Sequence, residues 1–300
     1  MRYTAYGLSI DSQIHLPELL SFEAGDAETA EVTIHFGPEA SAPPVDGHQL
    51  GPFLWVTPER LWLHVPRVAR FLISNGNDIC IAPEPGGDED SIRVFLLGSV
   101  FGALLLQRGQ LVLHGNAIRI GDQCMVCVGR SGVGKSTLAA GFLRRGYEIL
   151  ADDVVPVDNE CRALPGFPRI KLWQDVADRL NIDTTGLRRI RPNLEKFNYP
   201  IALTADTPPL PIRWIYILNR NPVFQEIRLE SIQGLQRFHP LHNNTYRVRF
   251  LDGMGQQPEH LERCGQLAGR VRLARVTRPD NGFQLDQLID RLLADVAENP

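Results

Sequence analysis

The sequence lacks a hydrophobic run long enough to cross a membrane. Its longest largely apolar segment, Val94–Leu106, has 13 residues, whereas a membrane-spanning helix needs about 20. The segment Met1–Ile10 has mixed polarity and no small-residue cleavage site, so it does not resemble a signal peptide. Cysteine is also scarce: five scattered residues give no disulfide framework and suit a reducing compartment. We therefore expect a cytoplasmic protein that does not bind membranes.

A basic excess is absent as well. The chain has 35 acidic and 31 basic residues and a net charge of −4. Proteins whose main role is to bind nucleic acid or membrane surfaces usually carry a basic excess, so we expect no nucleic-acid partner. Among the basic residues, lysine occurs only as Lys135, Lys171 and Lys196. Because lysine supplies a flexible point charge and arginine a fixed fork, the position of each lysine is informative.

The length and the pattern of the chain predict two domains of an α/β protein. At about 150 residues per domain, 300 residues suffice for two. The first 90 residues contain short alternating segments separated by proline and glycine, which is typical of strands. These segments are 30–36, 61–65 and 78–81. Residues 83–90 combine two prolines, two glycines and four acids and are the best linker candidate. We predict a small strand-rich N-terminal domain over 1–90 and a second domain over 91–300.

Helical and strand patterns alternate in the second domain. Val94–Leu106 predicts a buried helix, and Cys124–Val128 is apolar on both faces, as a central strand covered on both sides would be. Leu285–Val296 places its apolar residues on one stripe, which favours a helix docked on the domain over one that binds a partner. Further strands are expected at 111–114, 149–150, 214–218 and 271–276.

Residues 129–136 match the P-loop pattern G-x-x-x-x-G-K-[ST]. Glycines let successive backbone N–H groups point at phosphate oxygens, and the helix that follows adds its positive N-terminal end. Lys135 is expected to reach the β- and γ-phosphates, and Ser136 to ligate Mg²⁺. The motif therefore predicts ATP and Mg²⁺ as cofactors. The predicted nucleotide-binding residues are Gly129, Arg130, Ser131, Gly132, Val133, Gly134, Lys135, Ser136 and Thr137.

Two adjacent aspartates, Asp152 and Asp153, end an apolar strand shortly after the P-loop helix. A P-loop fold places a carboxylate at such a strand end, towards the metal or the attacking group. Adjacent carboxylates repel each other unless their roles are separated, for example with one on Mg²⁺ and one accepting a proton from a substrate hydroxyl. The alternative is that one of them caps a turn. His114, which ends the strand before the P-loop strand, is a candidate catalytic residue or a structural histidine.

These residues resemble a known family when they are taken together. Leu113-His114-Gly115, the P-loop, Arg145-Gly146 and Ala151-Asp152-Asp153 are similar in sequence and spacing to the catalytic domain of HPr kinase/phosphorylase, a bacterial serine kinase. A weaker resemblance extends over most of 94–276. In it, Pro165–Trp173 and Leu210–Trp214 are similar to the divergent HPr-kinase-related branch, which includes tailoring kinases encoded beside lasso-peptide precursors.

The resemblance implies an HPr-kinase-like catalytic domain that transfers phosphate from ATP to a Ser or Thr hydroxyl of a peptide or protein. It implies a ribosomal, lasso-type precursor peptide as the acceptor, Asp152 as the general base, and Asp153 in a network with the metal and His114. The glycine-rich signature that follows the aspartates in the bifunctional enzymes is not apparent, and Leu164–Pro168 stands in that region. This departure argues against the phosphorylase reaction and against HPr as the acceptor.

Other functions stay open. They are an HPr-type serine kinase/phosphorylase, an ATPase, and a regulatory protein that binds nucleotide without transferring phosphate. Transport and motor ATPases place their acidic strand far downstream of the P-loop, a pattern that this sequence does not have. A homo-oligomer is compatible with the sequence.

Two further groups of residues were considered for binding. Residues 161–200 carry eight basic and four acidic residues, and they predict a basic lip for phosphates or an acidic acceptor, mainly at Arg188–Arg191 and Lys196. Cys124 and Cys127 form a C-x-x-C pair, but no second Cys or His pair lies nearby in the sequence, so we predict that both are core residues.

Overall fold

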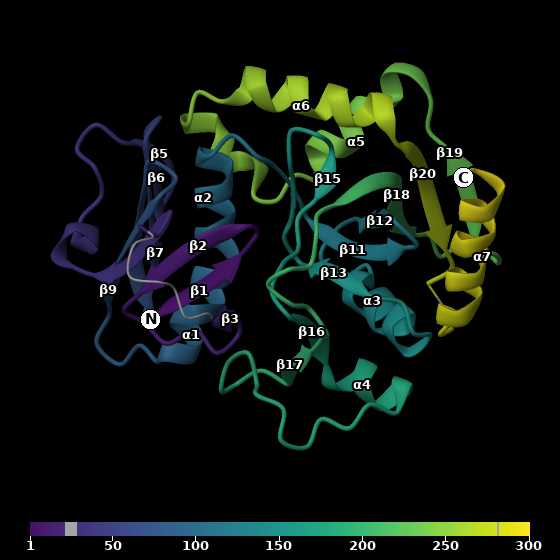
Figure 1. Cartoon of the computed structure of the whole chain (residues 1–300), viewed down its shortest axis with the longest axis horizontal. Coiled ribbons are helices and arrows are strands. Elements are labelled where there is room, and N and C mark those ends of the chain that lie inside the picture. The colour runs from purple at the N-terminus through teal and green to yellow at the C-terminus, as the bar shows by residue number, and fades with distance from the viewer. Residues whose placement is uncertain (22–28, 281) are drawn as a thin grey trace.

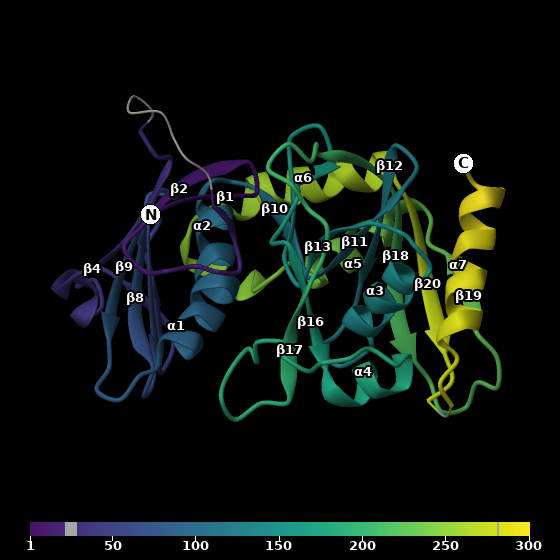
Figure 2. The same cartoon turned by 60° about the horizontal axis from the view of Figure 1, so that its bottom comes forward.

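The computed structural model describes residues 1–21, 29–280 and 282–300. Two nine-stranded sheets stand side by side, with helices packed against them (Figures 1 and 2). The predicted α/β class is therefore confirmed. Among the described residues, no helix is both long and apolar enough to span a bilayer.

The N-terminal sheet has the strand order β3-β1-β2-β4-β9-β8-β7-β6-β5. All three strand segments predicted in this region form strands, and their buried side chains alternate with exposed ones in β4. The bounds are β1 (Arg2–Ala5), β2 (Leu8–Ser12), β3 (Leu20–Ser21), β4 (Val32–Phe36), β5 (His48–Gly51), β6 (Leu54–Val56), β7 (Arg60–Val65), β8 (Ala69–Ser74) and β9 (Asp78–Pro83).

The buried helix predicted at Val94–Leu106 is confirmed, and it packs on the N-terminal sheet. It consists of α1 (Glu89–Phe95), a π-helical turn (Leu96–Val100) and α2 (Phe101–Gln107). Leu96, Phe101 and Leu104 share one apolar core with Ile10 and Phe71 of the sheet. The division at residue 90 remains a prediction, but apolar packing places this helix with the N-terminal strands.

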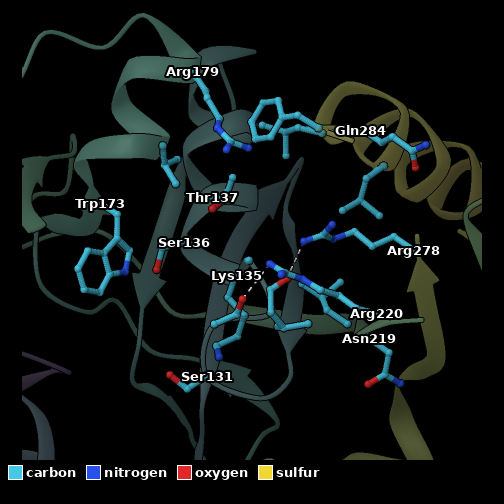
Figure 3. Close-up of a pocket in the computed structure, with 18 of the residues that line it drawn as sticks. Ser131, Lys135, Ser136, Thr137, Trp173, Arg179, Asn219, Arg220, Arg278 and Gln284 are labelled. Atoms are coloured by element: carbon cyan, nitrogen blue, oxygen red, sulfur yellow. Dashed lines mark hydrogen bonds between the residues drawn. The ribbon is translucent and has the colours of Figure 1, made fainter. Parts of the chain in front are cut away.

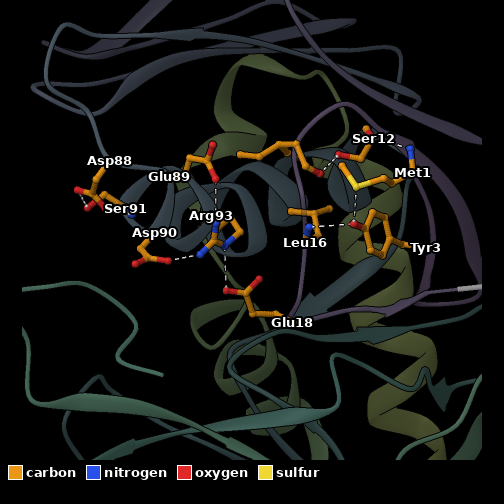
Figure 4. A network of polar contacts seen from close by, with 11 residues as sticks. Met1, Tyr3, Ser12, Leu16, Glu18, Asp88, Glu89, Asp90, Ser91 and Arg93 are labelled. Carbon is orange, nitrogen blue, oxygen red and sulfur yellow. Dashed lines mark hydrogen bonds and ion pairs between the residues drawn. The ribbon is translucent and has the colours of Figure 1, made fainter. Parts of the chain in front are cut away.

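The acidic segment 83–90 therefore joins two parts of the same core, which differs from the inter-domain linker that its composition suggested. Asp88 caps α1 by accepting a hydrogen bond from the Ser91 N–H at 2.7 Å. Arg93, which is 3% exposed, pairs with Glu18 at 3.1 Å and with Asp90 on its own helix. These contacts tie α1 to the N-terminal segment (Figure 4).

The second sheet contains the P-loop strand. Its order is β10-β14-β15-β18-β12-β11-β13, and β20 pairs with both β18 and β19. The strand bounds are β10 (Leu111–Leu113), β11 (Gly115–Ile120), β12 (Gln123–Val128), β13 (Ile149–Asp152), β14 (Val155–Val157), β15 (Arg162–Ala163), β18 (Leu210–Arg220), β19 (Arg228–Ser231) and β20 (Arg272–Arg278). Strand β12 lies between β18 and β11, and Cys124 and Cys127 are fully buried in it, which confirms the predictions of a central strand and of core cysteines.

Strand directions bring the predicted site residues to one edge of this sheet. β11 runs antiparallel to both β12 and β13, so β12 and β13 run parallel to each other and end at the same edge. β18 and β20 are parallel to β12 and end there too. Ligands commonly bind outside the carboxyl ends of parallel strands in such sheets.

Helices and a hairpin flank this edge. α3 (Lys135–Arg144) follows the P-loop, and α7 (Leu285–Glu298) docks on it as its apolar stripe predicted. The approach is close at Gly141, where a Cβ would lie 2.8 Å from atoms of Leu285 and Ile289. The hairpin is formed by β16 (Arg169–Trp173) and β17 (Lys196–Pro200), with α4 (Gln174–Leu180) directly after β16. The remaining helices are α5 (Phe238–Asn243) and α6 (Gln257–Arg270).

Candidate active site

The P-loop leaves β12 and turns sharply into α3. Gly134 has φ +108°, a conformation that favours glycine, and a Cβ on Gly129 would lie 2.8 Å from the carbonyl oxygen of Leu218. A side chain at either position would thus distort the loop. The glycines leave the start of α3 open to the cleft, where its unpaired N–H groups favour an anion.

Lys135 is folded beneath the loop. Its side chain is nearly buried, and its Nζ donates to the carbonyl oxygens of Gly129 at 2.8 Å and Arg130 at 3.2 Å. The Nδ2 of Asn116 donates to the Lys135 carbonyl at 2.5 Å and so fixes the first turn of α3. Burial lowers the pKa of Lys135, while the two aspartates oppose that shift. Lys135 is therefore a confined positive charge next to the loop.

Asp152 is the last residue of β13 and lies beside Ser136. The Ser136 Oγ is 3.3 Å from Asp152 Oδ1, and the backbone N–H of Lys171 donates to Asp152 Oδ2 at 2.9 Å. Burial raises the pKa of Asp152, and the charge of Asp153 raises it further. A raised pKa brings a carboxylate closer to the range in which it accepts a proton effectively near neutral pH.

Asp153 faces different partners. Its Oδ2 accepts from Lys171 Nζ at 2.7 Å, and its Oδ1 lies 3.4 Å from His114 Nδ1. Its backbone adopts φ +75°, which turns the chain directly after β13 and lets the two carboxylates diverge. Burial alone would raise the pKa of Asp153, but Lys171 and His114 hold it well below its usual value. Burial lowers the pKa of His114.

The donor set around Ser136 bears on whether the site can hold Mg²⁺. The described residues contain no cluster of three or more His, Cys, Asp or Glu side chains that would cage a metal ion. Mg²⁺ typically takes one or two carboxylates and completes its shell with substrate phosphates and water. Ser136 together with one carboxylate of the Asp152–Asp153 pair fits that pattern. The sequence paired Ser136 with Asp153, whereas the structure brings Ser136 next to Asp152.

The P-loop from Ser131 onward, the two aspartates and His114 line one cleft of about 510 Å³ (Figure 3). The predicted residues that line it are His114, Ser131, Gly132, Val133, Gly134, Lys135, Ser136, Thr137, Asp152 and Asp153. Gly129 and Arg130, at the start of the loop, do not line the cleft, and their carbonyls accept hydrogen bonds from Lys135. The basic lip is divided: Lys196 lines the cleft, whereas Arg191 donates to Ser91 of α1 at 3.1 Å.

Two arginines beside the loop were not predicted from any sequence pattern. Arg220 Nη2 donates to the Gly132 carbonyl at 2.9 Å, and Arg278 Nη2 donates to the Val133 carbonyl at 3.3 Å. They end β18 and β20 and are register partners. Burial lowers the pKa of Arg278, and Arg220 adds to the effect. Only the strand order, which a sequence does not display, brings them to the P-loop.

Comparisons with known proteins give similarities to solved structures. No family model matches the chain, and no curated protein matches it. Among solved structures, the chain is similar to the HPr(Ser) kinase/phosphatase from Coxiella burnetii, with 15% sequence identity and a TM-score of 0.29. That match covers 62% of this chain and 95% of the other. The function is therefore argued from the site itself.

Proposed function

We propose that this protein transfers the γ-phosphoryl group of ATP to a Ser or Thr hydroxyl of a peptide or protein. The observation that supports this best is the contact between Ser136 of the P-loop helix and Asp152 at the end of β13. It puts a carboxylate of raised pKa in the same cleft as the phosphate cradle. Such a pairing suits a reaction in which a hydroxyl proton is removed beside a bound phosphate.

The loop and the start of α3 would hold the phosphates through backbone N–H groups. Lys135 would exchange its contacts with the loop carbonyls for contacts with phosphate oxygens and would offset charge that develops during transfer. Mg²⁺, held by Ser136 and a facing carboxylate, would supply further positive charge next to the phosphates. Catalysis would then consist of positioning and charge stabilisation, without a covalent enzyme intermediate.

We assign Asp152 as the general base. Lys171 and His114 stabilise the ionised form of Asp153 and engage both of its oxygens, so Asp153 is the weaker base of the two. The resemblance of the sequence gives Asp153 a metal role, which would require Lys171 to release it. His114 would then act through Asp153, by fixing its orientation.

The acceptor class is taken from the sequence resemblance: a ribosomal, lasso-type precursor peptide. Intact-mass analysis of candidate peptides after incubation with the full chain, ATP and Mg²⁺ tests it. A gain of one phosphate on a peptide supports the kinase, and phosphorylation of HPr alone would favour an HPr-type enzyme. Loss of ATP without any phosphorylated acceptor would contradict the proposal and favour an ATPase.

A further inference from the structure

One end of the cleft has an apolar wall that phosphate binding does not require. The wall contains Phe283, Val176, Leu285 and Leu288, and Arg179 lies over the Phe283 ring. We propose that this wall binds an aromatic nucleobase, which stacks on Phe283 beside Arg179. The inference rests on the proposed use of ATP and names the part of the site that holds the base.

The direction of the bound nucleotide follows from the two ends of the cleft. The γ-phosphate must lie by Asp152 and Lys135, since that is where a hydroxyl would be deprotonated. Trp173 lies on the Ser136 side of the cleft, whereas Arg278 and Gln284 lie on the opposite side (Figure 3). A triphosphate that follows the loop therefore extends its nucleoside towards the segment between β20 and α7, which carries Phe283.

Phe283 is exposed and lies next to Arg179. Its relative exposure is 44%, so one part of the ring is accessible from the cleft that it lines. The guanidinium of Arg179, from α4, lies 5.4 Å from the centre of the ring. Within residues 1–21, 29–280 and 282–300, Arg179 has no carboxylate partner within salt-bridge distance. An aromatic ring and a free planar cation at one place form a platform for a π-system.

Stacking reads the face of a base and not its hydrogen-bonding edge. Purines offer a larger face than pyrimidines and should gain more from the same contact. We therefore expect ATP and GTP to bind more tightly than CTP and UTP.

Titration calorimetry on the full chain with Mg²⁺ tests the inference, with ATP, CTP and tripolyphosphate as probes. Phe283→Ala should weaken ATP binding roughly 5- to 150-fold, the range of one base–aromatic stack, and leave tripolyphosphate binding unchanged. Phe283→Trp should restore ATP binding, because an indole also stacks. Phe53→Ala is the matched control, since Phe53 is also 44% exposed but belongs to the turn before β6 in the N-terminal sheet.

The outcomes separate this inference from the proposed function. If Phe283→Ala weakens ATP and tripolyphosphate equally, or changes neither, the inference is wrong even where peptide phosphorylation is seen. If the variant behaves as expected but no acceptor is ever phosphorylated, the base site stands and the kinase proposal fails. A wild-type chain that binds tripolyphosphate as tightly as ATP, or that binds neither, overturns the inference.

Discussion

Replacing Lys171 by methionine tests the charge arrangement at the aspartate pair. The Lys171 Nζ lies 2.7 Å from Asp153 Oδ2, and the two side chains are 11% and 24% exposed. Methionine keeps the length of the side chain and removes its charge, so the Asp153 carboxylate keeps only His114, 3.4 Å away. Breaking a fully buried pair costs about 3–5 kcal/mol. Because Asp153 is about a quarter exposed, we expect the free energy of unfolding to fall by about 2–3 kcal/mol at pH 7.5.

Urea unfolding followed by tryptophan fluorescence measures this loss. Lys171→Arg, which keeps the charge, should lose less than half as much. A double-mutant cycle with Asp153→Asn isolates the pair and should give a coupling of about 1–3 kcal/mol.

The pH dependence supplies a second readout of the same pair. Because the folded pKa of Asp153 lies below its ordinary value of 3.8, Asp153 stabilises the fold above that pH. This stabilisation is lost as the pH falls from 3.8 through the folded pKa, and in Lys171→Met it should be smaller. A loss under about 0.5 kcal/mol at pH 7.5, together with a coupling near zero, would refute the reasoning.

Three other variants test separate parts of the molecule. Lys135→Ala should abolish phosphate transfer while its circular dichroism spectrum shows an unchanged fold. Normal turnover in that variant would show that the P-loop lysine is not needed for transfer. Asp152→Asn should abolish transfer in the intact-mass assay yet keep ATP binding, since an amide cannot accept the proton. An unchanged rate would show that another residue is the general base. His260 is 4% exposed, and burial lowers its pKa to about 4. Its neutral form is therefore favoured in the fold, so stability should fall by about 2 kcal/mol between pH 8 and pH 5. In a His260→Gln variant, this fall should be smaller when it is followed by urea unfolding, and an equal fall would contradict the assignment.

The parts of the site that the sequence predicted are local in the chain. The P-loop glycines, Lys135 and Ser136 are contiguous, and each is required by backbone geometry or charge at a fixed spacing. The prediction that Asp152 lies near them rested on a strand that ends in acid, and the parallel course of β12 and β13 gives that position its physical basis.

The parts that were missed depend on tertiary packing. Arg278 reaches the loop only because β20 pairs with β18, and Phe283 meets Arg179 from a segment about a hundred residues away. Likewise, the pattern of 94–106 predicted a buried helix but not which sheet would bury it, because an apolar stripe is complementary to many surfaces. Strand order and helix docking depend on contacts between distant parts of the chain, and a local sequence pattern does not encode them.

The three lysines of the chain all lie near the aspartate pair. Lys135, Lys171 and Lys196 all interact electrostatically with the aspartate pair, so three flexible cations surround two carboxylates. Burial lowers the pKa of both Lys135 and Lys196, and the two aspartates offset only part of that shift. An incoming triphosphate would supply the missing negative charge and raise both pKa values again. Phosphate binding should therefore be accompanied by proton uptake at a pH near the lowered values. Lysine suits this site because its ammonium group, on a flexible side chain, can shift with the phosphate charge during transfer. The planar guanidinium of an arginine binds best to a partner in a fixed geometry.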